Sequence, residues 1–291
     1  MEQKQTGIIT IGIGGFYTIA CADGQLIQCK PKGLFRKQGI KPLAGDNVKL
    51  SQEAGSWFID EILPRRNVFV RPPVANVDQF IIVVSTVEPS PSFLVIDKLL
   101  ALAEESEVSP ILVVTKNDLS EDVKLEDVYK NCGYPVFMLP SLVSDLQRLR
   151  QLLPGKLSVL CGNSGVGKTT LLNALLPGQE RETGEISQKL GRGRHTTRAV
   201  ELLAVEDGWL ADTPGFASLD LARVAPIFKE NLQYDFIDVA KHAGNCRFTG
   251  CTHLVEAGCA VRDALEKQEI APSRYESYCT MYTQAKQNEK Y

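Results

Sequence analysis

The sequence predicts a chain of three parts: an all-β barrel, a central α/β domain and a mostly helical C-terminal segment. Short strand-like segments between Gly, Asp and Pro turns fill the first part. Apolar strands then alternate with amphipathic helices, which indicates a doubly wound parallel sheet. After that the strand signal stops, and a compact group of cysteines and one histidine follows. We therefore predict domains at 1–66, 67–221 and 222–291.

The first domain is expected to be a small barrel. Its β-rich segments lie at 7–11, 16–20, 25–29, 47–50 and 57–62. Five short strands in so short a segment are typical of an OB-fold. Residues 30–41 carry five cations (Lys30, Lys32, Arg36, Lys37, Lys41) and no acid, and we expect this basic run to be a loop on the barrel.

The central domain begins with a strand that is apolar throughout. Residues 79–85 form a continuous apolar run of the kind that is buried on both faces of a parallel sheet. An amphipathic helix is expected at 93–106, and a C-terminal helix at about 273–290. The further strands expected in this domain are 110–115, 136–139, 157–161, 200–205 and 208–211.

The motif G-x-x-x-x-G-K-[ST] occurs at residues 162–169, between a predicted strand and a predicted helix. Its glycines let backbone amides converge on phosphate oxygens, and the helix N-terminus adds a favourable dipole. Lys168 is expected to contact the β- and γ-phosphates, and the Thr169 hydroxyl to coordinate Mg²⁺. The residues predicted to bind nucleotide here are Gly162, Asn163, Ser164, Gly165, Val166, Gly167, Lys168, Thr169 and Thr170.

A second phosphate motif, D-T-P-G, follows a later apolar strand. Its Asp212 is expected to hold Mg²⁺ directly or through a bound water, and the Gly215 amide to sense the γ-phosphate. Between the two motifs, one of two neighbouring threonines is expected to bind Mg²⁺ only when the triphosphate is present. The candidates are Thr196 and Thr197, and we favour Thr197.

The guanine motif [NT]-K-x-D is met after a predicted strand by Thr115, Lys116, Asn117 and Asp118. The Asp118 carboxylate can accept hydrogen bonds from guanine N1–H and N2–H₂, a pair that adenine does not offer, so the nucleotide is expected to be GTP or GDP. Lys116 is expected to pack along the base. Thr115 replaces the usual Asn, with the loss of one amide contact, and Ser141 is expected near guanine O6.

The motifs occur in permuted order. In ordinary G domains the phosphate-binding P-loop (here 162–169), switch I (here the Thr196–Thr197 region) and switch II (here D-T-P-G) precede the guanine motif. In this chain the guanine motif at 115–118 precedes all three. The same sheet results if the chain is cut after the second switch and rejoined through a helix near 145–153. The sequence therefore predicts a circularly permuted P-loop G domain.

The C-terminal cluster is Cys246-x4-Cys251-x-His253-x5-Cys259. Three thiolates and one imidazole suit tetrahedral Zn²⁺ in a closed structural site, and no further group suggests an open catalytic position. The alternative is three free cysteines beside an unrelated histidine. The remaining cysteines are scattered, and a tight cluster in a cytoplasmic chain indicates metal more often than disulfides.

The distribution of apolar residues gives no sign of a membrane segment. No apolar run approaches the ~18 residues of a membrane helix, and the N-terminus lacks an apolar signal core, so we expect a cytoplasmic protein. The formal net charge is -3. A second acid-free basic run at 189–198, beside the one at 30–41, nevertheless favours an anionic partner.

Together these motifs resemble the ribosome small-subunit-dependent GTPase A family of bacteria. The likeness rests on the barrel, on G-N-S-G-V-G-K-T, H-T-T and D-T-P-G in permuted order, and on the cysteine cluster. Shorter matches are G-D-N-V at 45–48 and N-V-D-Q at 76–79, while Asp97-Lys98 departs from the family's usual Asp-Arg.

The resemblance implies a GTPase that acts late in maturation of the 30S ribosomal subunit. It also implies a zinc-binding C-terminal domain and stimulation of GTP hydrolysis by the subunit. From the residues themselves we expect one structural zinc per chain, magnesium with GTP, and contact of the basic runs with 16S rRNA. We further expect hydrolysis to release the protein from the subunit. We expect a monomer. The alternative is a regulatory rRNA-binding module with a vestigial GTPase, against which the intact Lys168, Thr169 and Asp212 argue.

Catalysis is expected to need help from a partner. Ras-type hydrolysis uses a Gln just after D-x-x-G to orient water, and Phe216 occupies that position here. His195 is our candidate for positioning water, because a neutral imidazole can orient water or accept its proton. Its alternative role is a contact with rRNA phosphate or solvent. Lys168 and Thr197 complete the predicted catalytic set.

Overall fold

The computed structural model describes residues 4–70, 72–120, 125–130, 132–139, 143–178, 200–212 and 228–288. These residues belong to two compact units. One unit draws on residues 1–79, 148–160 and 168–219, and the other on residues 80–147, 161–167 and 220–291.

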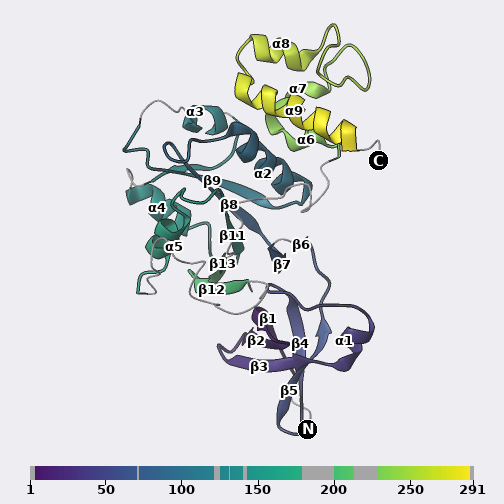
Figure 1. The fold of residues 1–291 in the computed structure, drawn as a ribbon, viewed down its shortest axis with the longest axis vertical. Coiled ribbons are helices and arrows are strands. Elements are labelled where there is room, and N and C mark those ends of the chain that lie inside the picture. The colour runs from purple at the N-terminus through teal and green to yellow at the C-terminus, as the bar shows by residue number, and fades with distance from the viewer. Residues whose placement is uncertain are drawn as a thin grey trace. The chain divides into compact units, whose positions relative to one another are not determined.

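The first unit contains a closed five-stranded barrel. Its strands are β1 (Lys4–Ile13), β2 (Phe16–Cys21), β3 (Leu26–Pro31), β4 (Asn47–Glu53) and β5 (Ser56–Ile62). They are hydrogen-bonded in the order β1-β2-β3-β5-β4, and β4 pairs again with β1 to close the barrel. Alternate side chains fill its centre, with Ile9, Ile19 and Ile59 fully buried. The predicted OB-fold barrel is confirmed (Figure 1).

The basic run at 30–41 differs from the expected loop. It begins in β3 and continues into a short helix, α1 (Gly33–Lys37). Lys32 forms ion pairs with Asp60 and, at 2.7 Å, with Glu53. These acids lie on β4 and β5, more than 20 positions away in sequence. The basic run alone therefore did not reveal that the barrel itself neutralises Lys32.

The first unit also holds strands from the central segment. These are β11 (Leu157–Cys161), β12 (Glu201–Val205) and β13 (Gly208–Asp212). The same unit holds α5 (Lys168–Leu175), between β11 and β12, and the small hairpin of β6 (Val68–Val70) and β7 (Pro73–Ala75). β11 runs parallel to β13, and β12 pairs antiparallel with β13. The strands predicted at 157–161, 200–205 and 208–211 are thus confirmed within one residue at each end.

The second unit contains three neighbouring strands in the order β10-β9-β8. They are β8 (Gln79–Ser85), β9 (Ser109–Thr115) and β10 (Val136–Met138), and β9 and β10 are parallel. All seven residues of β8 are buried, as its apolar run predicts. Helices α2 (Phe93–Glu105) and α3 (Leu125–Lys130) lie in this unit, and α4 (Val143–Arg150) begins in it.

The C-terminal part of the second unit is helical. Its helices are α6 (Leu232–Asp235), α7 (Ile237–Ala243), α8 (Ala260–Glu266) and α9 (Pro272–Asn288). Leu232, Phe236 and Tyr278 bury their side chains in one hydrophobic cluster with the metal-ligand candidate Cys259. None of the helices in the described part of the chain is long and apolar enough to cross a membrane.

A buried ion cluster joins α2, α7 and α9, which lie close together in Figure 1. Arg274 is fully buried and donates hydrogen bonds to Asp97 at 2.8 Å and to Asp238 at 2.6 Å and 3.1 Å. Tyr129 donates a further bond to Asp97 at 2.9 Å. Burial raises the pKa of Asp97. Burial is also the largest influence on the pKa of Asp238 and works to raise it, but the Arg274 charge and the hydrogen bonds to this carboxylate together outweigh burial and lower the pKa.

Candidate nucleotide-binding and metal sites

The P-loop has a backbone that only glycine accommodates at two key points. Gly162 and Gly167 have φ angles of 132° and 95°. A Cβ on Gly162 would lie 2.1 Å from the carbonyl oxygen of Val83, so any side chain there would displace the loop. Helix α5 begins at Lys168, directly after the last glycine. The loop therefore leads into a helix N-terminus, the arrangement that binds phosphate.

The guanine motif is hydrogen-bonded to the P-loop. Thr115 is buried at the end of β9, and its Oγ1 lies 2.6 Å from the carbonyl oxygen of Val166 and 3.0 Å from that of Val84. Since a hydroxyl has one hydrogen, the shorter contact is the donated bond. The methyl group also lies close to Gly167. The motif alone predicted a lost contact to guanine and did not reveal that the Thr115 hydroxyl supports the phosphate loop.

Lys116 is held by the segment that follows β8. Its Nζ donates to the carbonyl of Glu88 at 2.6 Å, and its own carbonyl accepts from Thr86 Oγ1 at 2.6 Å. Asn117 Oδ1 is buried without a hydrogen-bond partner among the described residues, whereas Asp118 is exposed. The carboxylate expected to select guanine is therefore open to an incoming base.

Several predicted site residues lie outside the described residues: Ser141, His195, Thr196, Thr197 and Gly215, together with Phe216. Asp212 closes β13, but its side chain is also outside the described part. Thr169 and Thr170 lie in the first turn of α5. The structure thus brings the guanine motif to the P-loop and leaves the roles of the two switches as predictions.

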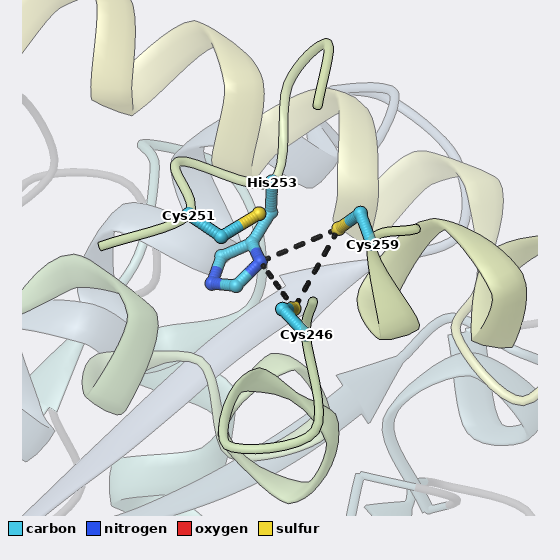
Figure 2. A group of neighbouring side chains, drawn as sticks. All are labelled: Cys246, Cys251, His253 and Cys259. Atoms are coloured by element: carbon cyan, nitrogen blue, oxygen red, sulfur yellow. Dashed lines mark hydrogen bonds between the residues drawn. The ribbon is translucent and has the colours of Figure 1, made fainter. Parts of the chain in front are cut away.

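The cysteine cluster forms one compact group of four ligand atoms. The Sγ atoms of Cys246, Cys251 and Cys259 and a ring nitrogen of His253 all lie within 4.8 Å of one another. Nδ1 of His253 lies 3.5 Å from Cys246 Sγ and 3.4 Å from Cys259 Sγ, and the two Sγ atoms are 3.9 Å apart (Figure 2).

These separations fit a tetrahedral ion. With metal–sulfur bonds of about 2.3 Å and metal–nitrogen bonds of about 2.0–2.1 Å, tetrahedral geometry requires about 3.8 Å between sulfurs and about 3.5 Å between sulfur and nitrogen. Burial raises the pKa of Cys251 to about 12, so the thiolate that binds metal needs a cation to stabilise it. The donor set can therefore hold a metal ion.

Glu256 organises the loop that carries two of the ligands. Its Oε1 accepts from the Thr252 amide at 3.0 Å and hydroxyl at 2.6 Å, and its Oε2 accepts from the Leu254 and Val255 amides at 3.1 Å. Burial works to raise its pKa, but these hydrogen bonds outweigh it and lower the pKa to about 2. The spacing of metal ligands gave no reason to single out Glu256.

Comparison with known proteins gives consistent matches. Residues 62–222 match the model of the RsgA GTPase family, and residues 6–56 match that of the RsgA N-terminal domain. The small ribosomal subunit biogenesis GTPase RsgA of Alkaliphilus metalliredigens is 41% identical, over 98% of this chain and 99% of its own. The protein of the same name from Bacillus subtilis is 40% identical, over 96% of this chain and 97% of its own.

Solved structures agree with these matches. The circularly permuted GTPase YloQ is similar with a TM-score of 0.79 and 35% identity, over 98% of this chain and 96% of its own. YjeQ from Thermotoga maritima is similar with a TM-score of 0.80 and 35% identity, over 97% of this chain and 99% of its own. The likeness therefore spans the barrel, the central domain and the cysteine cluster together.

Proposed function

The chain belongs to the RsgA GTPase family, and from this premise we propose that it hydrolyses GTP during late maturation of the small ribosomal subunit. The observation that supports this most is the bond from Thr115 to Val166, because it joins the guanine motif to the phosphate loop across the permuted sequence. The names of the relatives supply the ribosomal partner.

The mechanism relies on positioning and charge. The P-loop amides and the start of α5 bind the phosphates, and Lys168 contacts the β- and γ-phosphates. Thr169 and Asp212 would hold magnesium, which when bound neutralises charge that develops on the phosphates. One of Thr196 and Thr197 joins them in the triphosphate state, and the Gly215 amide senses the γ-phosphate. Because Phe216 cannot hydrogen-bond water, intrinsic turnover is slow.

Asp118→Asn is expected to exchange guanine for xanthine specificity. The amide loses one acceptor for the N1–H and N2–H₂ pair but gains a donor that suits the xanthine carbonyl. GTP affinity should fall by about 10⁴-fold, the scale on which a site built to hydrogen-bond its substrate rejects an analogue that leaves polar groups unpaired. Competition binding with GTP and XTP measures the change in nucleotide specificity. Asp127→Asn, on α3 and outside the motif, is the control, and unchanged GTP preference in Asp118→Asn would remove the guanine assignment.

His195→Ala is expected to lower subunit-stimulated turnover by about 10²-fold, the contribution of a positioned acid–base group, with GTP binding unchanged. The assay is phosphate release with saturating small subunits. His242→Ala is the matched control, since that imidazole pairs with Glu269 at 3.6 Å in the second unit. Stimulated turnover at the wild-type rate in His195→Ala would leave the histidine a contact to rRNA phosphate or solvent.

The metal is proposed to be zinc, one ion per chain with a structural role. A Cys₃His set without an open position suits zinc, and metal binding contributes folding free energy directly in small modules. Chelation, or Cys259→Ser, is expected to release the ion and lower the melting temperature of the second unit by several degrees. Metal analysis and thermal unfolding measure both effects. Cys279→Ser on α9 is the control and should retain the metal; a metal-free wild-type protein would contradict the assignment.

The partners follow from the same proposal. The basic runs, of which 189–198 lies outside the described residues, suit 16S rRNA phosphates, and we propose a monomer that acts in the cytoplasm. We also retain the division into a barrel at 1–66, a permuted GTPase domain at 67–221 and a zinc-binding helical domain at 222–291. The end of β5 at Ile62 supports the first boundary. A vestigial GTPase on an rRNA-binding module remains the alternative.

A further inference from the structure

Both ring nitrogens of His253 face protein groups. Nδ1 faces the sulfurs of Cys246 and Cys259, whereas Nε2 lies 3.1 Å from Oε1 of Gln233 (Figure 2 shows the sulfur side). The histidine is 1% exposed. Water therefore has little access to the ring, and the protein itself decides how the imidazole is oriented and protonated.

The contact with Gln233 determines the position of the ring proton. With Oε1 of Gln233 facing the ring, the contact requires the proton on Nε2, because an amide oxygen has no hydrogen and only accepts. A neutral imidazole has one such proton, and Nδ1 then keeps its lone pair. That lone pair points toward the sulfurs, where a tetrahedral ion would be bound.

The main chain of His253 is fixed by other groups. Its φ is 62°, a left-handed conformation, and its carbonyl accepts from Tyr275 Oη at 2.7 Å. Tyr278 Oη donates to the preceding carbonyl, that of Thr252, at 3.1 Å. These bonds hold the backbone but leave the imidazole free to turn over about its own axis, so the choice between Nδ1 and Nε2 is left to a contact with the ring.

Buried neighbours on both sides place Gln233 at that contact. It lies on α6 between the fully buried Leu232 and Phe236, which belong to the same hydrophobic cluster as Cys259. We propose that Gln233 is a positioning residue for the metal site: its amide oxygen fixes the Nε2–H tautomer of His253, so that the ion is bound through Nδ1. The proposal rests on the proposed metal occupancy.

A direct test is the tautomer of His253 in the zinc-loaded full-length chain. The chain has three histidines, so ¹⁵N-histidine NMR can assign each ring, with His253 identified by substitution of the other two. We expect a proton on Nε2 and a metal-bound Nδ1. A proton on Nδ1 with zinc on Nε2 would overturn the proposal, and this readout does not depend on GTPase activity.

Zinc affinity, measured by competition with a chromophoric chelator, gives the second test. Gln233→Leu is expected to weaken zinc binding by about 10–100-fold, the usual effect of removing a hydrogen-bond partner from a ligating histidine. Gln233→Glu keeps an acceptor and should bind zinc at least as tightly as wild type. Gln284→Leu makes the same chemical change at an exposed position of α9 and should bind normally.

The outcomes separate this proposal from the function it rests on. Wild-type zinc affinity in Gln233→Leu, or equal losses in Gln233→Leu and Gln284→Leu, would overturn the role of Gln233 while leaving the metal site in place. A wild-type chain that binds no zinc would overturn the metal site and, with it, the role of Gln233. Recovery in Gln233→Glu of what Gln233→Leu loses would support the assignment.

Discussion

Replacing Arg274 with methionine is expected to lower the free energy of unfolding by about 3–5 kcal/mol, because it leaves two buried carboxylates without their cation. Arg274 is fully buried, and its bonds to Asp97 and Asp238 link three helices of the second unit. Methionine keeps much of the side-chain volume, so the loss reports charge rather than a cavity. Urea unfolding at neutral pH, followed by a probe in this unit, measures the change.

The pH dependence gives a further check on the same variant. Without the guanidinium, burial raises the pKa values of Asp97 and Asp238 above their unfolded values, so both carboxyls take up protons on folding. For a carboxyl whose pKa is raised by folding, the contribution to the free energy of unfolding is fully present below the unfolded pKa, where the group is protonated in both states. This contribution is lost as the pH rises through the folded pKa. The deficit of Arg274→Met should therefore be smaller near pH 4 than near pH 8.

A matched control is Arg150→Met. Arg150 pairs with Glu206 at 2.6 Å, but both side chains are partly exposed, and such pairs contribute about 0–1 kcal/mol. An Arg274 variant no less stable than the Arg150 variant would mean that the buried ion cluster does not hold α2, α7 and α9 together.

Lys168→Ala is expected to reduce GTP turnover by at least about 10²–10³-fold, the scale of losing one preorganised charged or hydrogen-bonding group at the transition state. Lys168 begins α5 directly after the phosphate loop. There its ammonium group can stabilise the negative charge that develops on the γ-phosphate in the transition state. Phosphate release under saturating GTP measures the effect. Lys156→Ala, just before β11 and outside the loop, should keep wild-type turnover.

Retention of more than a tenth of the turnover in Lys168→Ala would contradict this role. A fall in nucleotide affinity without a fall in saturated turnover would also contradict it, because that pattern indicates binding shared equally by ground state and transition state.

Local patterns predicted the elements that depend on local information. The apolar run at 79–85 predicted β8 with the correct bounds. A strand that is buried on both faces is apolar at nearly every position, so the sequence marks it from end to end. The glycine motif at 162–169 likewise predicted a loop that leads into a helix, because the loop's backbone geometry requires glycine at fixed positions. The cysteine spacing predicted the ligand cluster, because metal ligands are restricted to a few residue types.

Contacts between distant residues could not be predicted in this way. Arg274 meets Asp97 across 177 positions of sequence, and nothing in either neighbourhood specifies the other. The same holds for Lys32 with its acids, Thr115 with Val166, and Gln233 with His253. Helices α6, α7 and α8 are too short for a clear periodic pattern, and they pack around one cluster that includes a metal-ligand candidate.

Stimulation of the GTPase by the ribosome is measured by GTP turnover of the purified chain with and without small ribosomal subunits. We expect slow phosphate release by the chain alone and a clear increase when subunits are added, with both lost in Lys168→Ala. Equal rates with and without subunits, or no hydrolysis in either case, would contradict it and favour an rRNA-binding module with a vestigial GTPase.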